Sequence, residues 1–161
     1  MSLLKRINKI LKDDELTYSY SNYVIHDYEN IMVKINKFKE VMTTLSNTRR
    51  KNQAQERKEL VEHLFRILKY IDISLETYTY DLVDLCVYVK NNQDMNPSHK
   101  TIKQKECALN TKVKLTQEFE TIYINFKNMT KKLDNIPMKE LLTSMRKIFD
   151  FKYHTDKELI F

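Results

Sequence analysis

The fold of this chain is decided by residues 61–89, which read VEHLFRILKYIDISLETYTYDLVDLCVYV. Apolar residues recur in this stretch at alternating spacings of three and four, an average of about 3.5 residues. Such spacing places them along one side of an α-helix, whereas a half-buried strand alternates with a period of two. The positions of this apolar seam are Val61, Leu64, Leu68, Ile71, Leu75, Tyr78, Leu82, Leu85 and Val89. The stretch therefore predicts a long helix that packs against other helices.

The same spacing occurs in two further stretches. The first seam contains Val24, Tyr28, Ile31, Ile35, Phe38, Met42 and Leu45. The third contains Leu115, Phe119, Ile122, Phe126, Met129, Leu133 and Ile136. Short connections make consecutive helices antiparallel. We predict a single all-α domain, residues 1–161, built as an elongated antiparallel bundle with coiled-coil-like seams. Its expected parts are a short helix at 2–12, long helices at about 20–46, 54–91 and 97–134, a short helix at about 137–149 and a tail at 150–161.

The composition excludes several classes of protein. The 161 residues include no glycine, so the tight phosphate-binding loops of P-loop and dinucleotide-binding proteins cannot form. Two cysteines are too few for a disulfide framework, which favours a reducing, cytoplasmic location. No window is apolar enough for a membrane span. The N-terminal stretch places basic residues among its apolar ones, which argues against a secretory signal.

Catalytic and metal-binding patterns are weak in this sequence. The four histidines, His26, His63, His99 and His154, do not pair at ligand spacing, and the cysteines form no CxxC motif. We therefore predict no metal site, no cofactor and no small-molecule substrate. No serine–histidine–aspartate set or carboxylate pair stands out from ordinary helix-surface charges.

One short motif deserves comparison with an enzyme family. Residues 57–63 read RKELVEH, an arginine followed by five residues and a histidine. This spacing resembles the short motif of HEPN ribonucleases, which are all-α bundles, and it implies RNA cleavage by Arg57 and His63. The resemblance covers seven residues. The residue after the arginine is Lys58, whereas those proteins usually carry a polar residue there, often Asn or Asp. We predict that this chain is not an enzyme.

The middle helix carries more than one apolar face, since Tyr70, Ile73 and Tyr80 lie outside its seam. Such a helix is either central in its own bundle or docked on something outside it. Tyrosine is enriched at surfaces that are dry on one side and wet on the other. We predict a protein-docking or self-association role. The expected interface residues are Tyr18, Tyr20, Tyr23, Tyr70, Tyr80, Val87 and Tyr88.

The basic charge leaves an alternative open. The net charge is +6, and the three long segments at 1–53, 54–91 and 96–134 carry +4, −2 and +4. Lysines and arginines of this kind bind nucleic-acid backbone without reading its sequence. The residues expected to do so are Arg49, Arg50, Lys51, Lys100, Lys103 and Lys105. Residues 2–12 also have the composition of a membrane-surface anchor, but we predict instead that they cap the bundle.

Overall fold

The computed structural model describes residues 2–92, 99–132 and 136–150. These residues form four α-helices: α1 (Leu3–Asn47), α2 (Ala54–Asn92), α3 (His99–Lys132) and α4 (Ile136–Phe149). A single 3-10 turn, η1 (Lys51–Gln53), leads into α2. The predicted all-α bundle is confirmed, and the described ranges contain no strand. The predicted tail at 150–161 lies, apart from Asp150, outside the described residues.

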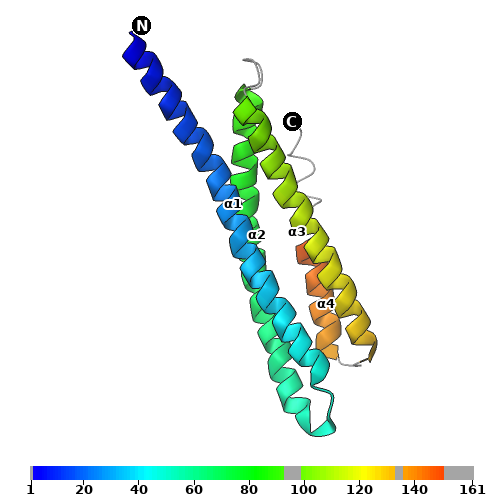
Figure 1. The fold of residues 1–161 in the computed structure, drawn as a ribbon. Helices are drawn as coiled ribbons and strands as arrows, with labels where there is room; N and C mark the ends of the chain where they lie inside the picture. The colour runs from blue at the N-terminus through cyan, green and yellow to red at the C-terminus, as the bar shows by residue number, and fades with distance from the viewer. Residues whose placement is uncertain (1, 93–98, 133–135, 151–161) are drawn as a thin grey trace.

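The helices lie side by side in an elongated bundle, with the short α4 beside α3 (Figure 1). The α1 and α2 helices are antiparallel, since the Tyr20 and Tyr88 rings lie 5.2 Å apart and Lys34 Nζ donates to Ser74 Oγ at 2.6 Å. The helix α4 is held to α3 by stacked rings of Phe119 and Phe149, 4.3 Å apart. The two contacts between α1 and α2 fix the direction of one helix relative to the other.

The three predicted seams form the core. Every seam position of α2, from Val61 to Val89, is buried. In α1, six of the seven are buried and Tyr28 is half-buried, while in α3 the four positions from Leu115 to Phe126 are buried. The helix α4 adds Met138, Leu141 and Met145. Most of the core therefore lies at the positions that the heptad spacing predicts.

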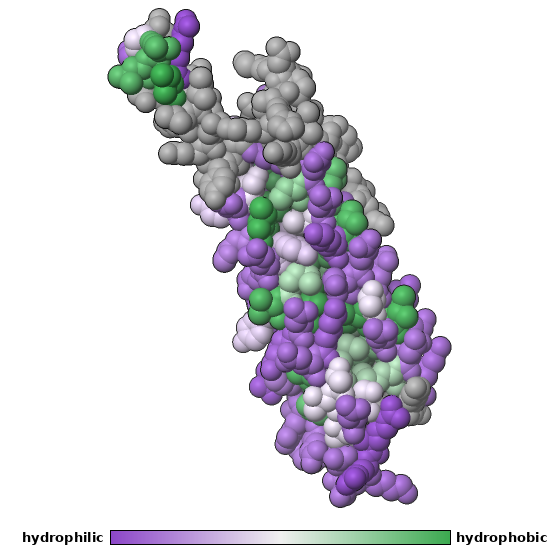
Figure 2. Space-filling model, in the orientation of Figure 1, coloured by the Kyte–Doolittle hydropathy of each residue, from purple (hydrophilic) through white to green (hydrophobic). Residues whose placement is uncertain are grey.

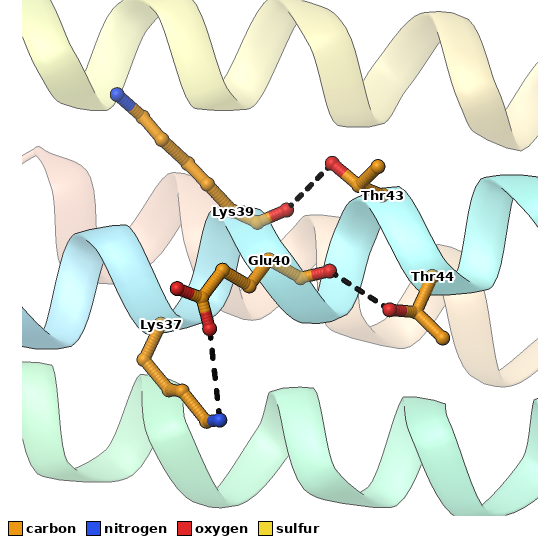
Figure 3. A network of polar contacts seen from close by, with 5 residues as sticks. All are labelled: Lys37, Lys39, Glu40, Thr43 and Thr44. Atoms are coloured by element: carbon orange, nitrogen blue, oxygen red, sulfur yellow. Dashed lines mark hydrogen bonds and ion pairs between the residues drawn. The ribbon is translucent and has the colours of Figure 1, made fainter.

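Charged side chains on α1 form a pair with α3 and a pair within α1 itself. Lys39 Nζ lies 2.5 Å from Glu118 Oε2 of α3, and Figure 3 shows Lys39 and Lys37 pointing to opposite sides of α1. Lys37 pairs with Glu40 at 3.7 Å within the same helix. Exposed pairs of this kind contribute at most about 1 kcal/mol each. The Lys39–Glu118 pair therefore selects α3 as the neighbour of α1 more than it stabilises the bundle.

One expectation about α1 is wrong. We expected a short helix at 2–12, a break, and a long helix from about residue 20, but Leu3–Asn47 is one helix of 45 residues. The expected break contains neither glycine nor proline. Polar residues alone lower helix propensity only slightly, and they do not end a helix that can continue its hydrogen bonding.

The N-terminal part of α1 projects beyond the bundle instead of capping it. The antiparallel register of α1 and α2 places residue 16 level with Asn92, the last residue of α2. Residues 3–15, which we call the α1 arm, therefore extend about 20 Å past the end of α2, as Figure 1 shows. Leu3 and Leu4 are 74% and 68% exposed. Within the described residues, no helix is both long and apolar enough to cross a membrane.

Candidate interaction surface

An exposed row of large apolar side chains runs along α2, on the side away from the core. The row contains Tyr70, Ile73, Tyr80 and Val87, which are between 51% and 67% exposed. Each of them follows a buried seam residue by two positions, as Ile73 follows Ile71. Two residues turn an α-helix by about 200°, so the row lies opposite the seam. We call these four residues the outer face of α2.

The outer face has the spacing of a second helix-packing seam. Ile73, Tyr80 and Val87 are seven residues apart, and Tyr70 precedes Ile73 by three. Side chains at this spacing form a continuous ridge that a partner helix can pack against. Exposed apolar rows rimmed by polar residues commonly mark interaction sites. This row needs no rearrangement of the bundle to become accessible.

The charges along the outer face are mainly acidic, with the exposed residues Lys69 and Lys90 at its two ends. Residues 70–89 contain Asp72, Glu76, Asp81 and Asp84, and no lysine, arginine or histidine. Asp72, Glu76 and Asp84 are exposed, and Asp81 is half-buried. An apolar ridge with an acidic rim favours a partner that is apolar and basic.

The predicted interface residues have different surroundings in the structure. Tyr70, Tyr80 and Val87 lie on the outer face, and Tyr23 is exposed on α1. Tyr20 and Tyr88 are half-buried and pack their rings against each other. The side chain of Tyr18 is outside the described residues. Ile73, an apolar residue outside the seam that was not among the expected interface residues, joins them on the outer face, because it lies seven residues before Tyr80.

The predicted nucleic-acid residues are only partly described. Arg49, Arg50 and Lys51 are exposed in the turn between α1 and α2. Arg49 Nε donates to the carbonyl oxygen of Ser46 at 2.7 Å, so this guanidinium caps the end of α1. The side chains of Lys100, Lys103 and Lys105 lie outside the described residues. The basic turn at 49–51 is therefore exposed. Nucleic-acid binding by the lysines at the start of α3 stays a prediction.

Arg57, half of the ribonuclease-like motif, holds the turn between α1 and α2 together. Its Nη1 atom donates to the carbonyl oxygens of Thr48, at 3.1 Å, and Arg50, at 2.7 Å. Thr48 is buried and follows the last residue of α1, where carbonyl groups lack helical partners. His63 is exposed on α2. These contacts give Arg57 a structural role in the turn.

Replacing Arg57 is therefore expected to destabilise the fold. In Arg57→Ala, the two carbonyl groups lose a charged donor, which should lower the free energy of unfolding by about 1–1.5 kcal/mol. The same substitution at the exposed Arg66 on α2 is the matched control and should change it by less than about 0.5 kcal/mol. Urea denaturation followed by circular dichroism measures both. Equal stability of the two variants would contradict the structural role of Arg57.

The cysteines have the properties of core residues. Burial raises the pKa of the Cys86 thiol to about 12, an effect that Lys112 partly offsets. Burial also raises the pKa of Cys107, against the opposing influence of Lys114. Because the thiolate is the reactive form, both groups are poor nucleophiles and poor metal ligands at neutral pH. Across the described part of the chain, His, Cys, Asp and Glu form no group of three that could hold a metal.

Two carboxyl groups meet where α1 and α2 pack together. Asp27 of α1 is hydrogen-bonded to Asp81 of α2, and its pKa is raised to about 7. Partial burial is the largest cause, followed by the hydrogen bond to Asp81 and the charge of that residue. Among the described residues, no donor reaches the buried Oδ2 atom of Asp27. Two carboxyl groups can share a hydrogen bond only when one of them holds a proton.

A groove of about 430 Å³ lies between α1 and α3. Its lining residues are Lys39, Met42, Thr43, Ser46, Thr121, Ile122, Asn125 and Met129. The one charged group in this lining, Lys39, is paired with Glu118. The lining offers no carboxylate, histidine or thiol for acid–base or nucleophilic chemistry. Of the surfaces described, the outer face of α2 is the stronger candidate for function.

Comparison with known proteins adds no relative: no family model, no curated protein and no solved structure matches the chain.

Proposed function

We propose that this protein is a non-enzymatic assembly subunit, a helical bundle that docks on a protein through the outer face of α2. The observation that carries the proposal is the heptad-spaced row of Tyr70, Ile73, Tyr80 and Val87, exposed opposite the buried seam of the same helix. A helix that is apolar on two opposite sides has one side more than its own bundle requires. The second side is explained by a partner.

The energetics of the outer face support this role. Burying an exposed tyrosine, isoleucine or valine side chain contributes about 1.5–3 kcal/mol relative to leaving it in water. Tyrosine is also among the residues that dominate binding energy when they lie at the centre of an interface. The helix α2 is held by buried contacts along its whole length. It therefore presents the outer face on a rigid element, which lowers the entropic cost of binding.

A charged residue on the outer face should abolish docking without unfolding the bundle. Ile73 and Ile124 give a matched pair, because both are exposed isoleucines, at 52% and 56%, on different helices. We expect tagged Ile73→Asp to lose a partner that the wild type and Ile124→Asp both retain. The measurement is affinity purification from the native cell at physiological salt, after nuclease treatment. Equal retention by both variants would place docking elsewhere or exclude it.

The alternative function is binding of nucleic-acid backbone, and the exposed turn of Arg49, Arg50 and Lys51 is the observation that favours it. Such binding weakens steeply as salt rises, because it depends on the release of counterions. Omitting the nuclease distinguishes the two functions. Partners that disappear with nuclease, and RNA or DNA that co-purifies, support the alternative. A partner retained after nuclease supports docking between proteins.

A further inference from the structure

We infer that the partner of the outer face of α2 is the α1 arm of a second copy of this chain, exchanged reciprocally between two bundles. This inference rests on the proposed docking role of the outer face and names its occupant. The arm is a second exposed apolar surface among the described residues. Leu3, Leu4 and Ile7 are all exposed on it, and Figure 2 shows a hydrophobic cluster at this tip, separate from the body of the bundle.

Charge selects the arm as the occupant. Within the arm, residues 3–12 carry Lys5, Arg6, Lys9 and Lys12, whereas the acidic residues Asp13, Asp14 and Glu15 lie at its base, next to the bundle. Residues 70–89 carry four acidic residues, with Lys69 and Lys90 at either end. The basic free ends of two arms would therefore repel each other, and so would two outer faces, whereas the free end of an arm and an outer face attract. Complementary charges of this kind select partners and exclude incorrect pairings.

The dimensions of the two surfaces agree. The arm projects about 20 Å beyond the end of α2, and the fifteen residues from Ile73 to Val87 span about 21 Å. The arm cannot reach the outer face of its own α2, because it continues the straight axis of α1 away from the bundle, as Figure 1 shows. If a second bundle is inverted relative to the first by a two-fold rotation, its arm points back toward the first bundle. That arm can then lie along α2 of the first bundle. The two-fold symmetry then forms the contact twice and leaves no open end.

The experiment uses the full-length chain and reversed charges. Sedimentation equilibrium of the wild type is expected to give about twice the monomer mass of 19.5 kDa. An arm variant, Lys5→Glu with Arg6→Glu, and a face variant, Glu76→Lys with Asp84→Lys, should each raise the dimer Kd about tenfold or more. All four positions are exposed, so both variants should keep the helical circular dichroism of the wild type. Mixing the two variants should restore the dimer, because each arm then meets a face of opposite charge.

The mixture is the decisive measurement. Restored association in the mixture, and not in either variant alone, supports arm exchange. A monomeric wild type overturns it, as does a dimer that the arm variant leaves unchanged. Binding of a monomer to anionic phospholipid vesicles through Lys5 and Arg6 also overturns it and identifies the arm as a membrane anchor. If the wild type is monomeric but a nuclease-resistant partner is still lost from Ile73→Asp, the proposed docking function stands and only the identity of the partner is wrong.

Discussion

Ile71→Ala is expected to lower the free energy of unfolding by about 2–5 kcal/mol, the largest effect that we predict for a single truncation. Ile71 is fully buried at the centre of the α2 seam. Removing its side chain takes apolar contacts from the core and leaves a cavity that long, straight helices can close only by bending. For a chain of this size, a loss of about 3 kcal/mol corresponds to a fall in Tm of about 6–12 °C.

Ile73→Ala is the matched control, because it makes the same change two residues away on the opposite side of the same helix. Ile73 is exposed, so the monomer should lose less than about 0.5 kcal/mol. Chemical denaturation of both variants measures the difference, at a protein concentration too low for association. An equal loss of stability in the two variants would mean that the outer face is buried within the monomer. That result would contradict both the bundle geometry and the docking role.

The contrast between Ile71 and Ile73 also shows which part of the fold can be predicted from the sequence. Heptad spacing identifies the seam because burial of one side of a helix imposes the helical period on apolar residues. The boundary between α1 and α2 was also predicted closely, since the polar stretch at 46–53 removes any apolar residue that could continue either seam. The continuity of α1 was missed, because a polar stretch without a breaker looks the same in sequence whether it ends a helix or extends it.

The candidate site was harder to predict from sequence, for two physical reasons. In the sequence, Tyr70, Tyr80 and Tyr88 have the same pattern, since each is a tyrosine outside the seam. In the structure, Tyr88 packs on Tyr20, whereas the other two face solvent. Which of them is covered depends on where α1 crosses α2, and local spacing does not contain that information. The pairing of Asp27 with Asp81 is likewise a property of the register between two helices. It joins residues that are 54 positions apart in the sequence.

Asp27→Asn is expected to stabilise the protein at pH 8 and to remove a pH dependence from its stability. The pKa of Asp27 is raised from 3.8 to about 7 by burial and by Asp81. Between about pH 4 and pH 7 the folded protein therefore holds a proton that the unfolded chain has released. Stability falls as the pH rises through this window, and the loss is complete above pH 7. Because Asp27 is partly exposed, solvent screening reduces the expected change to about 2 kcal/mol.

The amide introduced at position 27 carries no charge at any of these pH values, and it can donate a hydrogen bond to the Asp81 carboxylate. We therefore expect the wild type to be more stable at pH 5 than at pH 8, and Asp27→Asn to be similarly stable at both. Asp72→Asn, at an exposed carboxylate of α2, is the control and should keep the dependence of the wild type. Guanidinium denaturation of the three proteins at both pH values tests the expectation. A wild type that is equally stable at both would mean that Asp27 and Asp81 do not share a proton, and that α1 and α2 pack in a different register around this pair.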